Sequence, residues 1–238
     1  MIPLRDANPT RRTPIVTLAL IAAATVVFAY ELGIAETGGE DALARFIQQW
    51  GAVPADVNAA LAAGDWFGGA SLGVVTSIFL HGGWLHLIGN MLYLWIFGNN
   101  IEDRFGRVPY LLFYLAGGVA AALAQVAIDP TSAIPMVGAS GAIAAVLGAY
   151  LVMFPRARVL SLVFLGVFYQ LIEVRAVLVL GFWFVLQLID GLTSLGIPEA
   201  EGGIAFFAHI GGFVAGMIVG IVVRAAGRGQ PTTPALMG

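Results

Sequence analysis

The side chains of Ser140, His209, His86 and Asn90 have the types and the spacing that nucleophilic catalysis requires. Ser140 stands in the run GASGA, His209 in AHIGG, and His86 and Asn90 lie four residues apart in HLIGN. A serine hydroxyl is a weak nucleophile until a base takes its proton, and an imidazole does this near neutral pH. Attack on a carbonyl carbon creates an oxyanion, which hydrogen-bond donors stabilise. The pattern predicts a Ser140–His209 dyad, with the Ser140 backbone N–H, His86 and Asn90 on the oxyanion.

The composition places these residues in a membrane protein. Of 238 residues, 59% are hydrophobic and only 11% are charged, with a mean hydropathy of +0.91. A soluble domain carries about 25% charged residues, so this chain has too few to cover a water-facing surface. The absence of cysteine excludes disulfides and thiolate chemistry. The net charge of −3, carried without any lysine or basic patch, predicts no nucleic-acid partner. The absence of lysine beside abundant alanine, glycine and arginine suggests a bacterial source.

Six apolar segments are predicted to be membrane-spanning helices, and the arginines decide their orientation. The segments are 13–34, 83–101, 108–128, 138–154, 176–195 and 205–223. The first is longer than a typical signal-peptide core, so we expect it to be retained. With the N-terminus in the cytoplasm, every arginine except Arg45 falls on the cytoplasmic side, as the positive-inside tendency favours. A seventh span at 159–173 would break that pattern, so 159–173 is predicted to be a cytoplasmic interfacial segment, helical or strand-like.

The predicted fold class is an all-α polytopic membrane protein, a bundle of six transmembrane helices. Residues 1–12 are expected to be a cytoplasmic tail, 13–224 the transmembrane domain and 225–238 a flexible tail. Residues 35–82, between the first two helices, are expected to form a large, non-helical external loop. The segment 138–154 has 17 residues and reaches about 25 Å, less than the roughly 30 Å hydrocarbon core. Its first residues are therefore expected in a water-filled depression.

Each candidate residue also has a structural explanation when it is considered alone. A membrane serine often packs between helices, and a histidine or asparagine often forms a hydrogen bond between them. Gly141 after Ser140, and Gly212 and Gly216 after His209, predict small faces that let two helix backbones approach. The six-span arrangement nevertheless places all four candidate residues in the outer half of the membrane. That coincidence favours catalysis over packing.

Three sequence runs resemble the rhomboid intramembrane serine proteases in their bacterial six-helix form. They are FLHGGWLHLIGNMLYLWIFGNNIEDRFG (79–106), GASGA (138–142) and AHIGGFVAG (208–216), and the resemblance covers about residues 13–224. It implies that Ser140 is the nucleophile and His209 the base of a dyad without an acid. It also implies that His86 and Asn90 support the oxyanion hole, that Gly138 shapes the turn before Ser140, and that Glu102 and Arg104 belong to a cytoplasmic structural cluster.

The resemblance also implies the substrate and the location. The substrate would be a transmembrane helix of another protein, cleaved in the bilayer near its outer end through an acyl-enzyme, with no cofactor or metal. The expected location is a bacterial inner membrane, with both termini in the cytoplasm. One feature departs from some relatives, which carry an aromatic residue four positions after the serine, where this chain has Ala144. The candidates to orient the His209 ring instead are Phe206, Phe207 and Phe213.

Other functional classes fit the sequence less well. A metalloprotease would show HExxH, which is absent, and three histidines make a poor zinc set. An aspartyl intramembrane protease needs two membrane aspartates, and only Asp190, near the outer end of the span 176–195, comes close to meeting that requirement. A transporter would usually show internal repeats, and none is evident. The remaining alternative is a non-catalytic rhomboid-like adaptor that binds transmembrane segments, which would have no need of Ser140 and His209.

Overall fold

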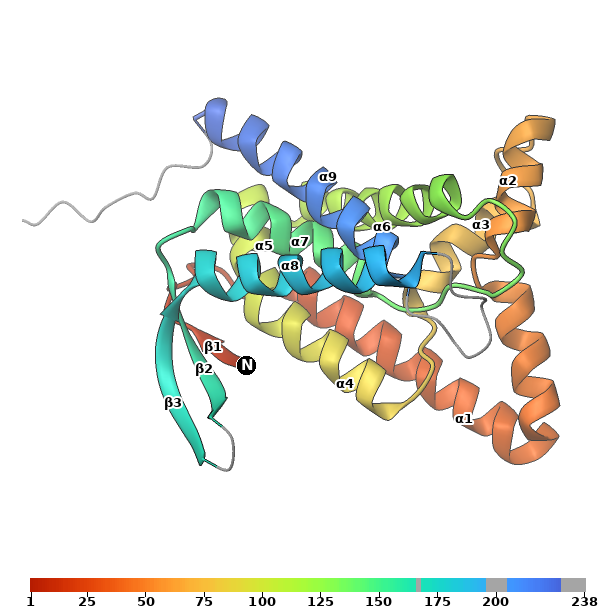
Figure 1. Ribbon diagram of the computed structural model, residues 1–238, viewed down its shortest axis with the longest axis horizontal. Coiled ribbons are helices and arrows are strands. Elements are labelled where there is room, and N and C mark those ends of the chain that lie inside the picture. The colour runs from red at the N-terminus through yellow and green to blue at the C-terminus, as the bar shows by residue number, and fades with distance from the viewer. Residues whose placement is uncertain (166–167, 196–204, 228–238) are drawn as a thin grey trace, which may run out of the picture.

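The computed structural model describes residues 1–165, 168–195 and 205–227, which form a helical bundle with a small sheet at one end (Figure 1). The helices are α1 (Ile15–Trp50), α2 (Pro54–Ala63), α3 (Gly69–Thr76), α4 (Trp84–Tyr93), α5 (Asn99–Phe105), α6 (Arg107–Ile128), α7 (Ser140–Met153), α8 (Ala176–Ser194) and α9 (Phe206–Ala225). A short 3-10 helix (Ser77–Phe79) follows α3, and a π-helical turn (Leu94–Gly98) joins α4 to α5. The strands are β1 (Ile2–Asp6), β2 (Arg158–Leu165) and β3 (Phe168–Arg175).

The long apolar helices make this an integral, multi-pass membrane protein. In the described part of the chain, α1, α6, α8 and α9 are each long and apolar enough to cross a membrane. A fifth candidate span combines Gly69–Phe79 with Trp84–Phe105, two segments that meet at an angle of 79°. Helix α7 is apolar but has only 14 residues. The count of six spans therefore stays a prediction, because it depends on a helix shorter than the bilayer core.

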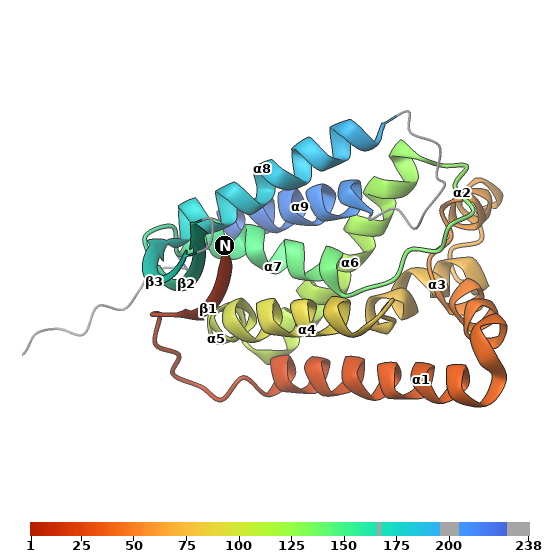
Figure 2. The same ribbon diagram turned by 60° about the horizontal axis from the view of Figure 1, so that its bottom comes forward.

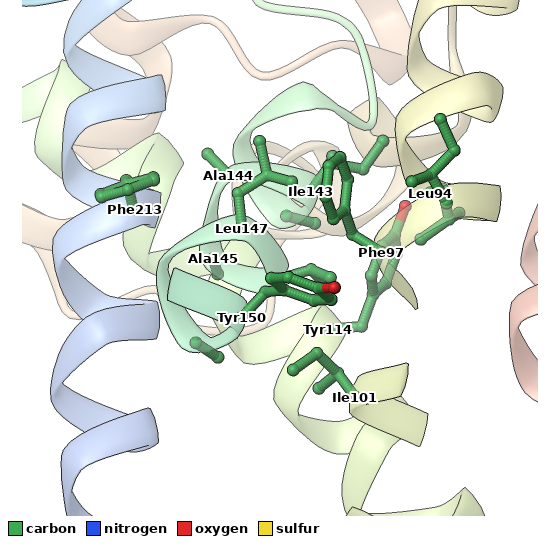
Figure 3. Packing of buried hydrophobic residues seen from close by; sticks show 14 of the residues in the cluster. Leu94, Phe97, Ile101, Tyr114, Ile143, Ala144, Ala145, Leu147, Tyr150 and Phe213 are labelled. Carbon is green, nitrogen blue, oxygen red and sulfur yellow. The ribbon is translucent and has the colours of Figure 1, made fainter. Parts of the chain in front are cut away.

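Helix α7 is the centre of the bundle, with α4, α6, α8 and α9 around it (Figure 2). Every residue from Gly141 to Tyr150 is buried. Aromatic rings from neighbouring helices, including Phe97 and Phe213, pack around its small residues (Figure 3). A Cβ atom on Gly212 would overlap the carbonyl oxygen of Gly141 on α7, and one on Gly216 would overlap that of Ala145. These glycines thus let α9 lie directly against α7.

The start of α1 is held by a carboxylate from α5. Glu102, only 3% exposed, accepts hydrogen bonds from the backbone N–H groups of Val16 and Thr17 at 3.0 and 2.8 Å. The Thr17 hydroxyl donates to the same carboxylate at 2.8 Å. The first N–H groups of a helix have no partner within it, and a negative charge is favourable there. Nearby, the guanidinium of Arg104 lies 5.4 Å from the Phe154 ring centroid.

The expectation of a non-helical loop at 35–82 is wrong. Helix α1 continues past residue 34 to Trp50, with a kink at Gly39, whose φ of 74° is non-helical. Beyond the kink, the Phe46 ring packs against Tyr30 and Trp50, at centroid distances of 5.6 and 6.5 Å. This apolar packing stabilises a second helical section, and α2 and α3 follow it. The region that joins the first two predicted spans is thus mostly helical.

The all-α prediction holds for the bundle but is wrong for the end that carries the sheet. Strands β2 and β3 form an antiparallel hairpin from Arg158↔Arg175 to Leu165↔Phe168, so 159–173 takes the strand-like alternative. Strand β1, within the expected N-terminal tail, pairs antiparallel with β2. Most of the expected C-terminal tail, residues 228–238, lies outside the described residues.

A buried polar network attaches β1 to the bundle. The Asp6 carboxylate accepts hydrogen bonds from the Tyr150 hydroxyl at 2.8 Å and the Asn100 amide at 2.6 Å. Asn8 also donates to the Tyr150 hydroxyl, at 2.9 Å. Burial raises the pKa of Asp6 above its usual value, although the hydrogen bond from Tyr150 opposes that shift. Tyr150 lies at the opposite end of α7 from Ser140, so this network links the sheet to the helix that begins with the serine.

Candidate active site

The structure brings Ser140 and His209 together. Ser140 is the first residue of α7, and His209 lies in the first turn of α9. The Ser140 Oγ and His209 Nε2 are 2.7 Å apart, which is hydrogen-bond distance, and both residues are half-buried. The contact follows from the close packing of α7 on α9, because the glycines between them keep the two helix starts together. The Ser140 backbone N–H belongs to the first turn of α7, where the helix itself supplies no acceptor.

The other nitrogen of the His209 ring contacts a residue that the sequence reasoning missed. The Gln187 amide oxygen, from α8, lies 2.6 Å from His209 Nδ1. One helical turn earlier, Trp183 places its ring centroid 6.0 Å from that of His209, with 39° between the planes. The signal that could have found Gln187 is a polar amide in the middle of a mostly apolar predicted span.

The phenylalanines named as candidates to orient the histidine make other contacts. Phe213 stacks on Phe184 of α8, with ring centroids 4.5 Å apart and 21° between the planes. Phe206 and Phe207 lie against Gly191 near the end of α8. The residues that do contact the His209 ring from α8 are thus a glutamine and a tryptophan.

His86 approaches the serine through Gly138. The backbone N–H of Gly82 donates to His86 Nδ1 at 3.3 Å, which leaves the ring proton on Nε2. A Cβ on Gly138 would lie 2.6 Å from that Nε2, so the ring rests directly against the Gly138 backbone. Gly138 has a φ of 123°, which residues with a side chain rarely adopt. Both its conformation and its contact therefore require glycine, two residues before Ser140.

Asn90 lies on the same side of the site as His86, and its side-chain amide donor has no partner. Its side chain is 8% exposed, and its Nδ2 has no hydrogen-bond partner. A Cβ on Gly138 would lie 3.6 Å from this nitrogen, which places His86 and Asn90 on one side of the turn before the serine. Such a buried, unpaired donor is rare in proteins and calls for an explanation.

A second, deeper contact supports the position of His86. The Glu31 carboxylate of α1, 2% exposed, accepts the backbone N–H of His81 at 3.2 and 3.3 Å. The His81 ring is buried, with its centroid 5.2 Å from that of His86. Glu31 thereby holds the backbone next to Gly82, whose N–H fixes the His86 ring. The sequence reasoning gave neither Glu31 nor His81 a part in the site.

A small cavity of about 40 Å³ lies beside the serine. A buried water needs roughly 10–15 Å³ of such volume, so the cavity is large enough to hold water. The residues that line the cavity are mostly apolar. They include Ile78, Gly118, Ala121, Met136, Ala142 and Ser140 itself. The cavity therefore leaves unfilled space next to the hydroxyl.

Known proteins match this chain over about two thirds of its length. Rhomboid protease GluP of Bacillus subtilis is 34% identical over 164 residues, which are 69% of this chain and 28% of that protein. RHOMBOID-like protein 5 of Arabidopsis thaliana is 31% identical over 63% of this chain and 43% of its own length. Rhomboid protein 1, mitochondrial, of Saccharomyces cerevisiae is 27% identical over 66% of this chain and 43% of its own length. The chain thus spans less than half the length of these relatives.

The family model of the Rhomboid domain matches residues 69–226, which is more than half of the chain. That range includes His86, Asn90, Ser140, Gln187 and His209. The chain therefore belongs to the rhomboid family.

Proposed function

We propose that this protein is an intramembrane serine endopeptidase that cleaves the transmembrane helices of other membrane proteins near their outer ends. The observation that carries the proposal is the 2.7 Å contact between Ser140 Oγ and His209 Nε2. A relative whose name describes a protease supports it. A non-catalytic adaptor on the same scaffold would not need a nucleophile aligned with a base.

The dyad supports acyl transfer in two steps. Ser140 Oγ attacks the carbonyl carbon of the scissile peptide while its proton passes to His209 Nε2. As the C–N bond breaks, Nε2–H gives this proton to the departing amine, which leaves an ester on Ser140. A water molecule then gives a proton to Nε2 and attacks the ester carbon. The bond to Oγ breaks, Ser140 regains its proton, and the substrate leaves as a carboxylic acid.

Three donors support the charge that forms during each attack. The Ser140 backbone N–H lies at the start of α7, where the helix dipole favours negative charge. The His86 Nε2–H points to the Gly138 turn, and the Asn90 Nδ2 lies nearby without a partner. We assign these three groups to the oxyanion hole, with Gly138 as the turn that makes room for it.

The same proposal includes an orientation in the membrane. The arginine pattern favours a cytoplasmic location for the sheet end of the bundle, and so for the N-terminus and the end of α9. The Ser140 end of α7 would then face the exterior, with α7 as a short sixth span whose beginning lies below the outer surface. A bacterial inner membrane is the location that we propose.

Labelling with a fluorophosphonate probe tests the proposal, because such probes modify a serine only when it is activated as a nucleophile. We expect labelling of the purified wild-type protein, with the adduct on Ser140 by mass spectrometry. Ser140→Ala and His209→Ala should each reduce the labelling rate by about 10⁴-fold or more, since the two residues act as a unit. Ser71→Ala is the matched control, because the Ser71 hydroxyl donates to the Asp65 carbonyl oxygen away from the site. Equal labelling of all four proteins would overturn the dyad.

A further inference from the structure

Within the described residues, Gln187 makes the one hydrogen-bond contact to His209 Nδ1, on the side of the ring that faces away from Ser140. Its amide oxygen is 2.6 Å from Nδ1, on the side of the ring opposite the 2.7 Å contact from Nε2 to Ser140. An amide oxygen only accepts hydrogen bonds, so this contact places the ring proton on Nδ1. Nε2 is then left with a lone pair directed at the Ser140 hydroxyl. This is the tautomer in which the imidazole can take the serine proton.

We propose that Gln187 is the positioning residue of this dyad, fixing the Nδ1–H tautomer and the orientation of His209 through its amide oxygen. The inference rests on the proposed protease function and adds a third residue to it. A group beyond the base that orients the imidazole is the arrangement that makes a histidine an effective base for serine. Gln187 supplies that arrangement without a carboxylate, so the ring remains neutral before attack.

The position of Gln187 in the fold explains why this chain can carry Ala144 where a larger ring would otherwise support the histidine. Ala144 is completely buried in α7 and has no side chain that reaches across the His209 ring. The ring is supported instead from α8, where Trp183 lies beside it and Gln187 binds its Nδ1. Trp183 is also packed on Phe213 of α9, at a ring distance of 5.9 Å. Trp183 and Gln187, one turn apart on α8, thus orient the His209 ring.

The test compares two substitutions of Gln187 with one of Gln125. Gln187→Met keeps the length of the side chain but removes the acceptor oxygen. Gln187→Glu keeps an acceptor oxygen, because an ionised carboxylate accepts hydrogen bonds and donates none. Gln125→Met is the matched control, because the Gln125 amide oxygen accepts the Ala208 N–H at 3.3 Å and so contacts α9 next to His209 through backbone alone. The fluorophosphonate labelling rate and the kcat and KM for a transmembrane substrate are measured across pH.

We expect Gln187→Met to lower the labelling rate and kcat by about 10- to 100-fold with little change in KM. Gln187→Glu should stay within a few fold of wild type near its optimum, and the acid limb of its pH profile should move to higher pH. The reason is that a carboxylate beside Nδ1 favours the protonated ring. Gln125→Met should remain close to wild type.

Other outcomes overturn the inference without touching the dyad. Wild-type rates in Gln187→Met, or equal losses in Gln187→Met and Gln125→Met, would show that the amide oxygen has only a packing role. An unshifted pH profile, or complete inactivity, in Gln187→Glu would show that the glutamine does not accept a hydrogen bond from Nδ1–H. Absence of labelling in the wild type would instead overturn the proposed function, so the two failures are distinguishable.

Discussion

The two sides of the candidate site differ in how fully their polar groups are paired. On the base side, Ser140 Oγ, both nitrogens of His209 and the Gln187 amide oxygen form one continuous chain of hydrogen bonds. On the donor side, Asn90 Nδ2 is buried with no partner. Within the described residues, the only other buried side-chain nitrogen without a partner is Nε2 of His81, which packs against His86.

In the proposed reaction, this difference indicates which side of the site is complete before substrate binds. A buried donor without a partner costs about 1–3 kcal/mol of stability. A protein tolerates such a cost where charge will later develop, because an oriented donor stabilises the transition state more than the ground state. We interpret the base side as already arranged for proton transfer. On the donor side, Asn90 Nδ2 has no acceptor. The oxyanion of the tetrahedral intermediate would supply one.

Replacing the free donor should separate activity from stability most clearly. Asn90→Leu keeps the size of the side chain and removes the unpaired amide. We expect a labelling rate about 10²-fold lower, while the free energy of unfolding stays unchanged or rises by about 1 kcal/mol because a buried polar group is gone. Gln187→Met, on the paired side, should lower both quantities. Unfolding in mixed micelles and probe labelling measure the two effects, and a large loss of stability in Asn90→Leu would show that the amide is structural.

A smaller effect is expected one contact further from the reaction, at Glu31. Glu31→Leu removes the acceptor of the His81 N–H, which should cost about 1–3 kcal/mol of unfolding free energy. It should also reduce the labelling rate severalfold, because the backbone that holds His86 Nδ1 is loosened. Glu31→Gln keeps an acceptor oxygen and should stay close to wild type in both measurements. If Gln and Leu behaved alike at this position, the contact to His81 would not matter for the donor side.

The smallest effect is expected at the far end of α7, where the Asp6 network is fully paired like the base side. The raised pKa of Asp6 means that the folded state holds this proton more tightly than the unfolded state. The contribution of Asp6 to stability is therefore present at low pH and is lost as pH rises through its folded pKa. Asp6→Asn should flatten that part of the pH dependence and change stability at neutral pH by about 1 kcal/mol or less. Unfolding followed across pH tests this, and labelling should be unchanged.

Much of the site could be predicted because its residues sit in short motifs with fixed helical spacing. HLIGN places His86 and Asn90 on one helix face, and GASGA and AHIGG place Ser140 and His209 at helix beginnings. Gln187 could not be predicted in the same way, since no motif surrounds it and its partner is 22 residues away on another helix. Glu31 was missed for the same reason, because its partner is a backbone N–H 50 residues along the chain.

The fold shows the same division. Apolar segment length and arginine placement predicted the positions of α4 through α9, apart from boundaries that differ by a few residues. The helical section after Gly39 and the pairing of β1 with β2 were not predicted. The first depends on ring packing between Tyr30, Phe46 and Trp50, and the second on pairing between residues about 155 positions apart.

The sequence by itself determined that the chain belongs in a membrane, because hydropathy and charge are properties of the residues wherever they lie. It also determined which serine, histidines and asparagine are candidates, because their spacing within single helices is local. Only the tertiary structure decided which nitrogen of His209 meets Ser140, which group holds the other nitrogen, and which donor is left free. Those outcomes depend on how α4, α7, α8 and α9 pack, and side-chain contacts between separate helices are set by that packing rather than by any one segment.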